Sequence, residues 1–195
     1  MRLSFIPNLL TIARILVVPL IVWLLLQGQY QWALGLAIFA GLSDLLDGWL
    51  ARRYSWQTRW GGILDPLADK LLMMAGYLTL GWLGQLPWWL IVLVIIRDLV
   101  IVTGGTIYYT RLEKFDAEPT QLSRFNTFCQ VFLMCFVLVR LAGLPLPREA
   151  QIGLVWLVGL MAVATLVQYV WVWSMRAVKL SRSRREGEAA DSNDR

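Results

Sequence analysis

Six long apolar segments dominate this chain and limit what it can fold into. Each is close to the length of helix that crosses the roughly 30 Å hydrocarbon core of a membrane. Of the 195 residues, 58% are hydrophobic and only 16% are charged. The pattern predicts an all-α, polytopic membrane protein with six transmembrane helices. The expected spans are Leu9–Leu26, Trp32–Leu50, Ile63–Leu83, Trp88–Tyr109, Phe125–Leu141 and Ile152–Trp173.

The basic residues are distributed unevenly between these segments. The connectors after the second and fourth spans and the C-terminal tail are rich in arginine and lysine, whereas residues 27–31 and 84–87 contain no charge. By the positive-inside rule, both termini and the two basic connectors lie in the cytoplasm. This orientation accounts for the net charge of +5, and no nucleic-acid partner is expected. Residues 1–180 are expected to form one membrane domain, followed by a disordered polar tail at residues 181–195.

Four aspartates interrupt the apolar pattern. Asp44 and Asp47 close the second span, and Asp65 and Asp69 open the third, so both pairs lie at one depth near the cytoplasmic face. One Asp at a helix centre costs roughly 3 kcal/mol to insert, so four unpaired carboxylates would cost on the order of 10 kcal/mol. Spacings of three and four place each pair on one helix face. Carboxylates on two facing helices favour one or two Mg²⁺ or Mn²⁺ ions, which suit phosphoryl chemistry.

Purely structural roles stay open for several of these residues. Asp65 followed by Pro66 is a good helix start, with the aspartate as N-cap. Gly48 and Ala51 are typical of close helix packing, and Arg52 of a positive-inside anchor. The chain contains no histidine, which excludes histidine-ligated metal sites and histidine catalysis.

Written as D-x2-D-G-x2-A-R-x8-G-x3-D-x3-D, residues 44–69 match the signature of the CDP-alcohol phosphatidyltransferase family at every fixed position. The chain resembles that family over most of its length. The resemblance implies a transferase of phospholipid biosynthesis that moves the phosphatidyl group of CDP-diacylglycerol to a hydroxyl acceptor and releases CMP. It also implies two Mg²⁺ or Mn²⁺ ions, a homodimer, and a multi-pass location in a bacterial inner membrane with the active site facing the cytoplasm.

The resemblance assigns roles to individual residues. Asp44, Asp47 and Asp65 would ligate the metal ions, while Asp69 would complete the metal site and act as the catalytic base. The residues that would bind the cytidine nucleotide and its diphosphate are Gly48, Ala51, Arg52 and Gly61, with Asn8 and Thr11 from the N-terminal stretch IPNLLTIAR.

The sequence resembles two branches of the family that use different acceptors. The segments IPNLLTIARILVVPL and DPLADKLL resemble phosphatidylglycerophosphate synthases, which use glycerol 3-phosphate. The segments IIRDLVIVTGGTIYY and EPTQLSRFNTFCQ resemble eukaryotic-type cardiolipin synthases, which use phosphatidylglycerol. Phe125 stands where that branch has a lysine, with Arg124 directly before it. Phosphatidylglycerol is the preferred acceptor, glycerol 3-phosphate the alternative, and Arg14, Arg97 and Arg124 the expected acceptor-binding residues.

Rival classes of membrane protein fit the acidic pattern less well. An aspartate-rich membrane prenyltransferase would carry its two acidic motifs far apart in sequence and would not need the G-x2-A-R element. A cation transporter would spread its acids across the bilayer, whereas here they gather at one face. For Arg97 and Asp98, a buried ion pair that holds the fourth span is the alternative to acceptor binding.

Overall fold

The computed structural model of the chain describes the backbone of residues 6–54, 61–111 and 120–193, and the side chains of residues 15–43, 68–104 and 120–172. Every regular element in these ranges is an α-helix, and each predicted span lies on a helix with ends that agree to within a few residues, except that the last helix continues about twenty residues beyond Trp173. The helices are α1 (Ile6–Leu26), α2 (Tyr30–Tyr54), α3 (Gly61–Trp82), α4 (Trp88–Arg111), α5 (Gln121–Leu141) and α6 (Arg148–Asn193). The prediction of an all-helical fold is therefore confirmed.

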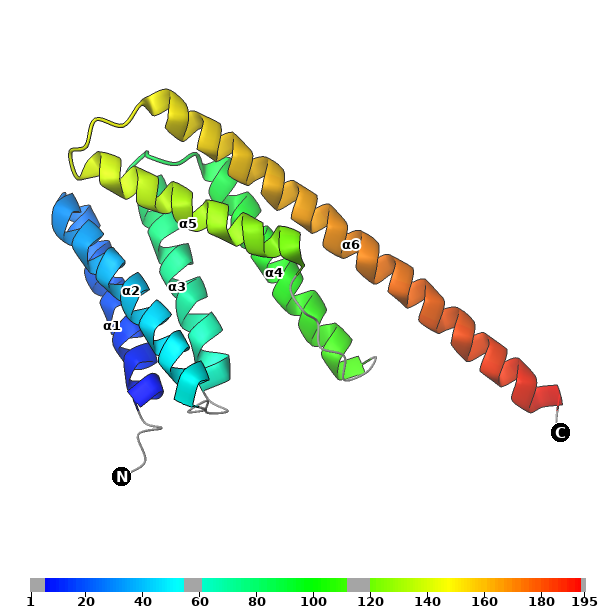
Figure 1. Cartoon of the computed structure of the whole chain (residues 1–195). Coiled ribbons are helices and arrows are strands. Elements are labelled where there is room, and N and C mark those ends of the chain that lie inside the picture. Colours follow the sequence, from blue (N-terminus) through cyan, green and yellow to red (C-terminus); the bar gives the residue numbers. More distant parts are fainter. Residues whose placement is uncertain (1–5, 55–60, 112–119, 194–195) are drawn as a thin grey trace.

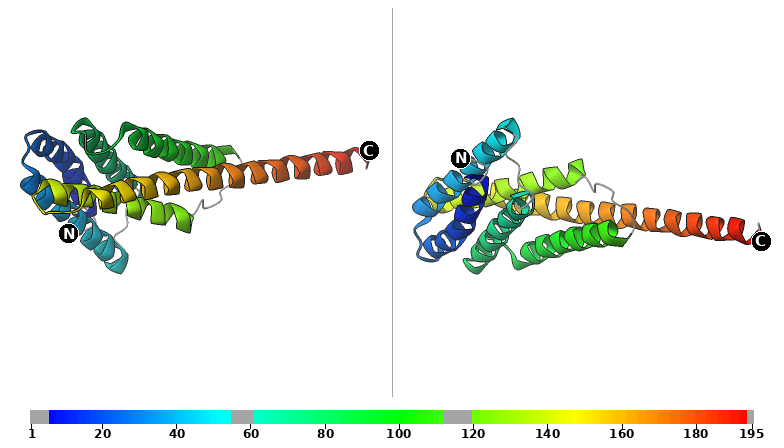
Figure 2. Two further views of the ribbon diagram at one scale, coloured as in Figure 1. Left: turned by 90° about the horizontal axis from the view of Figure 1, so that it is seen from above. Right: turned by 90° about the horizontal axis from the view of Figure 1, so that it is seen from below.

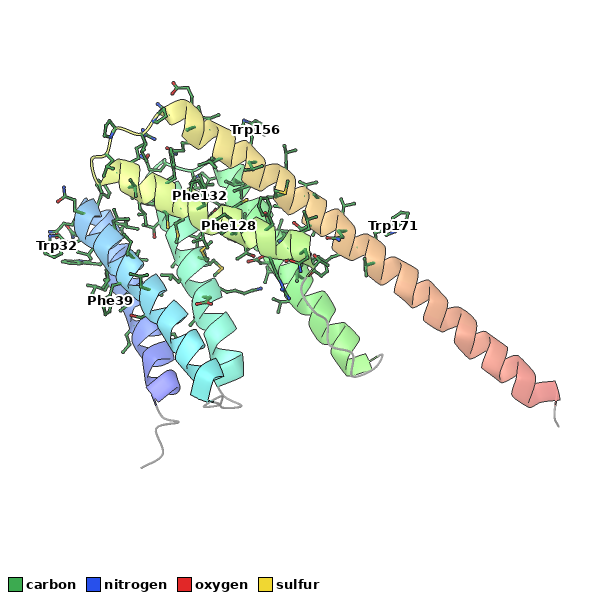
Figure 3. The ribbon with its side chains drawn as sticks, viewed as in Figure 1. Trp32, Phe39, Phe128, Phe132, Trp156 and Trp171 are labelled. Atoms are coloured by element: carbon green, nitrogen blue, oxygen red, sulfur yellow. The ribbon has the colours of Figure 1, made fainter. Side chains whose placement is uncertain are left out.

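The described surface is strongly apolar. Aromatic side chains project outward from the bundle (Figure 3), and Trp32, Phe128 and Trp171 are 73%, 64% and 67% exposed. Within the described residues, Gln121–Leu141 and Arg148–Val172 are long and apolar enough to cross a membrane, while Ile15–Leu26 and Tyr30–Ser43 are shorter apolar segments. Apolar surface of this extent indicates a membrane protein. Six spans with cytoplasmic termini stay a prediction.

Consecutive helices run in opposite directions, so the connections alternate between two ends of the bundle (Figure 1). At the upper end, α1, α3 and α5 each close with a glycine at positive φ, namely Gly28, Gly84 and Gly143. In each case the next residue donates its N–H back to a carbonyl five residues earlier, as in Gln29 to Leu24 at 2.9 Å. This Schellman geometry satisfies carbonyls that a helix end leaves unpaired.

Helices α3 and α5 each contact three other helices and so lie at the centre of the packing. Among the described residues, α1 packs against α2 and α3, α5 against α2, α3 and α6, and α4 against α3 and α6. The largest fully buried side chains include Tyr77, Leu80, Leu90 and Leu133, which lie between α3, α4 and α5. The views in Figure 2 show α6 extending well beyond the neighbouring helices.

That extension differs from the predicted disordered tail. The structure continues α6 as a helix to Asn193, through the polar residues that follow position 180. Arginine, glutamate and alanine are strong helix formers, which accounts for the continued helical backbone. The domain boundary at residue 180 and disorder of the tail in solution stay predictions.

Close contact between α4 and α6 yields a stability prediction. A Cβ at Gly159 would lie 2.9 Å from two ring atoms of Trp89, whose indole packs 5.2 Å from that of Trp156. Gly159→Val is expected to destabilise the protein by about 1–3 kcal/mol, since the helices must separate. Gly153 has no atom within 4 Å of its built Cβ, so Gly153→Val is the matched control. The check is the thermal unfolding midpoint in detergent, and equal midpoints for the two variants would contradict this packing.

Candidate active site

The backbone places the four aspartates on two helices at one end of the bundle. Asp44 and Asp47 lie in the last part of α2, and Asp65 and Asp69 lie in the first part of α3. Both segments are helical, so each pair shares a helix face as expected. Because α3 begins at Gly61, Asp65 lies one turn inside the helix, and the alternative that it caps the helix is wrong.

Helix α1 lies against both acid-bearing helices. The start of α1, the end of α2 and the start of α3 lie at the lower end in Figure 1. The predicted metal and nucleotide residues are therefore on neighbouring helix segments. The side chains of ten predicted residues lie outside the described ones: Asn8, Thr11, Arg14, Asp44, Asp47, Gly48, Ala51, Arg52, Gly61 and Asp65.

Asp69 is the predicted acid whose side chain the structure describes. It is exposed, while its neighbour Ala68 is completely buried. Asp69, Met73 and Tyr77 follow one another at intervals of four, so Asp69 lies on the same stripe of α3 as Tyr77, about 12 Å further down the helix axis. Within the described side chains, no three histidine, cysteine, aspartate or glutamate residues group together as metal ligands. Since most of the predicted ligands are outside that set, the metal site stays a prediction.

Arg97 lies inside the bundle, where it joins α4 to α5. Its side chain is 5% exposed, and its Nη1 donates to Oδ1 of Asp98 at 2.6 Å. Its Nη2 donates to Oγ of Ser123 on α5, also at 2.6 Å. The ion pair on the fourth span is therefore present, with Arg97 buried and Asp98 29% exposed, and Ser123 adds a contact that links two helices. Acceptor binding by Arg97 stays a prediction. Charge-assisted bonds of this kind are the stronger hydrogen bonds in proteins.

Polar side chains on α5 continue this cluster. Ser123, Asn126 and Gln130 are 7%, 0% and 3% exposed, and Tyr77 on α3 donates to the carbonyl of Gln130 at 3.0 Å. Four buried atoms have no hydrogen-bond partner among the described residues: Nε of Arg97, both amide atoms of Asn126, and Nε2 of Gln130. Buried polar groups in native proteins are nearly always paired, so these atoms require a polar group or water between α3, α4 and α5.

Ser123, Asn126 and Gln130 lie in the segment EPTQLSRFNTFCQ that resembles cardiolipin synthases, but sequence reasoning gave them no individual role. The signal was present, since positions 123, 126 and 130 share one helix face within an apolar span. The two described acceptor candidates are not equivalent. Arg97 belongs to the buried cluster, whereas Arg124 is exposed on α5.

Thr120 joins the start of α5 to α6. Its side chain caps α5 by accepting the N–H of Ser123 at 3.3 Å. Its hydroxyl also donates to Oε1 of Gln168 at 3.2 Å, and its own N–H donates to the hydroxyl of Tyr169 at 3.4 Å. The polar cluster is therefore connected to α6 through the first residue before α5.

Comparison with known proteins decides the family. Residues 4–174 match the family model for CDP-alcohol phosphatidyltransferase. The chain belongs to the CDP-alcohol phosphatidyltransferase family. Family members of this kind depend on divalent metal ions.

Several curated proteins resemble this family member. A Drosophila melanogaster protein named probable cardiolipin synthase (CMP-forming) is 38% identical over 85% of this chain and 56% of its own length. A CDP-diacylglycerol–glycerol-3-phosphate 3-phosphatidyltransferase from Aquifex aeolicus is 36% identical over 63% of this chain and 68% of its own. The Rattus norvegicus cardiolipin synthase (CMP-forming) is 37% identical over 62% of this chain and 40% of its own. The chain thus spans little more than half of the fly protein that it matches.

The Arg97 ion pair yields a prediction about stability. Asp98→Leu leaves a guanidinium in an apolar interior without its carboxylate, which is expected to destabilise the protein by about 3 kcal/mol. Adding Arg97→Met removes the unpaired charge and should restore much of that loss. Arg124→Met, on the exposed side of α5, is the control and should leave the thermal midpoint nearly unchanged. A double variant no more stable than Asp98→Leu alone would contradict the pairing.

Proposed function

We propose that this chain transfers the phosphatidyl group of CDP-diacylglycerol to a lipid hydroxyl and releases CMP. The observation that carries the proposal is the family match over residues 4–174, within which the D-x2-D…D-x3-D signature is intact and lies on α2 and α3. The match also supports a membrane domain of residues 1–180.

The proposed metal site consists of Asp44, Asp47, Asp65 and Asp69. These donors are all carboxylates, two on each of two helices that adjoin α1, and such a set fits hard divalent cations such as Mg²⁺ or Mn²⁺. When bound, two such ions would neutralise the phosphate oxygens of the substrate. Without a bound cation, the two helices would hold four negative charges close together, and these would repel one another. Cation binding would remove that repulsion.

Asp69 is the proposed base. It would take the proton from the attacking hydroxyl as that oxygen bonds to the phosphorus bearing the diacylglycerol. The bond between this phosphorus and the bridging oxygen then breaks, and CMP leaves with that oxygen. The exposure of Asp69, beside the completely buried Ala68, supports this role because a base must be reachable by substrate.

Small and basic residues beside the acids would bind the nucleotide. Gly48, Ala51 and Gly61 leave room for the cytidine and diphosphate to approach the helix backbone. Arg52 would pair with a phosphate, and Asn8 and Thr11 on α1 would supply further polar contacts. The position of α1 against both acid-bearing helices supports a shared cavity.

The preferred acceptor is phosphatidylglycerol, with glycerol 3-phosphate as the alternative. Proteins named cardiolipin synthase are similar to this chain, and so is a glycerol-3-phosphate phosphatidyltransferase. Arg97, Arg124 and Arg14 would bind the acceptor. The unpartnered atoms of Arg97, Asn126 and Gln130 support contact with a polar head group.

Phe125 bears on this choice. It is 51% exposed and stacks with Phe128, with ring centroids 6.5 Å apart, so it lies on the outer side of α5 rather than beside the buried Asn126. The presence of Phe125 where the related branch has a lysine therefore removes no charge from the buried cluster. A homodimer in a bacterial inner membrane, with the site facing the cytoplasm, completes the proposal.

The role of Asp69 is tested by Asp69→Asn, which removes the base and a metal ligand while keeping the side-chain shape. CMP release from CDP-diacylglycerol is expected to fall by about 10²–10⁴-fold, with an unchanged elution volume and thermal midpoint. Glu149→Gln, an exposed acid at the start of α6, is the control and should keep full activity. Turnover by Asp69→Asn at the wild-type rate would refute the assignment.

The metal site is tested by chelation. Excess EDTA is expected to abolish CMP release, and Mg²⁺ or Mn²⁺ to restore it, because four carboxylates cannot hold a diphosphate without cations. Undiminished activity in EDTA, measured after dialysis to remove bound ions, would contradict the metal site.

A further inference from the structure

A continuous set of hydrogen bonds runs from α6 through the start of α5 to Arg97 on α4. The hydroxyl of Thr120 donates to Gln168 on α6, and the N–H of Thr120 donates to the hydroxyl of Tyr169 on the same helix. Thr120 accepts the N–H of Ser123. The hydroxyl of Ser123 then accepts Nη2 of Arg97. Three helices are connected in this way.

Thr120 is the residue on which this connection depends. A threonine hydroxyl has one proton to donate and lone pairs to accept. Here the proton goes to Gln168 and a lone pair takes the N–H of Ser123, so one oxygen serves α5 and α6 together. The first turn of α5, which carries Ser123, is therefore held in register with α6.

The consequence falls on the Arg97 guanidinium. Asp98 is its neighbour on the same helix and moves with it, so Asp98 does not fix the group relative to the rest of the bundle. Ser123 holds the second Nη atom from α5. With both Nη atoms held, the planar guanidinium has one orientation, and its Nε edge stays buried without a partner among the described residues.

We propose that Thr120 is a positioning residue for acceptor binding: through Ser123 it ties the guanidinium of Arg97 to α6. The inference rests on the proposed function, in which Arg97 binds the head group of the acceptor lipid. In that function CDP-diacylglycerol binds at α1, α2 and the start of α3, so a change at Thr120 acts on one substrate and spares the second.

The test compares Thr120→Val with Thr120→Ser in the purified full-length protein. Valine keeps the shape and removes the hydroxyl, whereas serine keeps the hydroxyl. In mixed micelles of CDP-diacylglycerol and phosphatidylglycerol, Thr120→Val is expected to raise the KM for phosphatidylglycerol about tenfold, because a displaced contact group binds poorly. The KM for CDP-diacylglycerol should stay near the wild-type value. In Thr120→Ser, the KM values for both substrates should stay near those of the wild type.

Two further variants locate the effect. Gln168→Leu removes the bond from α6, and its combination with Thr120→Val should be no worse than Thr120→Val alone, because both changes break one connection. An equal rise in both KM values, or effects of the two variants that multiply, would overturn the proposal.

Hydrogen exchange measured by mass spectrometry provides a readout that needs no activity. Exchange in the first turn of α5 is expected to rise in Thr120→Val and not in Thr120→Ser, and unchanged exchange would overturn the proposal. Failure of the proposed function has a different signature: the wild-type protein would release no CMP with any acceptor, while the exchange difference would still report on the connection.

Discussion

The cost of placing polar groups inside an apolar helical bundle explains the arrangement of this protein. Carboxylates, amides and a guanidinium lose their water when they enter such an interior and must find partners there. The chain meets this constraint at two levels. Four aspartates gather on α2 and α3 at one end, and a buried cluster around Arg97 lies between α3, α4 and α5. Most of the remaining interior in the described bundle is apolar packing that holds these groups in place.

The buried polar groups differ in whether the protein supplies their hydrogen-bond partners. Arg97 has two charge-assisted bonds, to Asp98 and Ser123, so its charge is neutralised by the protein itself. Asn126 keeps both amide atoms without a partner among the described residues, although it is completely buried. Buried amides in native proteins are nearly always paired, so Asn126 requires a polar group or water beside it. A head group that reaches from Asp69 toward Asn126 would connect the chemistry to the bundle interior.

Sequence reasoning located the helices but not the contacts of the interior cluster, and the roles of the four aspartates stay predictions. The length of the apolar runs located all six helices, because about 20 apolar residues form a helix that can cross a membrane. It did not locate the end of α6, which continues through polar residues to Asn193. The spacing of Asp44, Asp47, Asp65 and Asp69 needed only helical geometry to place each pair on one face. The alternative that Asp65 caps the third helix was wrong because the helical backbone already begins at Gly61, so the Asp-Pro pair at 65–66 lies inside the helix. The link from Thr120 to Gln168 depends on helix packing between positions 48 apart, which no local pattern encodes.

Transfer of a phosphatidyl group from CDP-diacylglycerol to phosphatidylglycerol is the central claim. The most direct measurement supplies the purified protein with CDP-diacylglycerol, Mg²⁺ and equal amounts of phosphatidylglycerol and glycerol 3-phosphate, and identifies the lipid products by mass spectrometry. Cardiolipin and CMP are expected in equal amounts. Phosphatidylglycerophosphate as the sole product would contradict the acceptor, and CDP-diacylglycerol left intact with both acceptors would contradict the transferase itself.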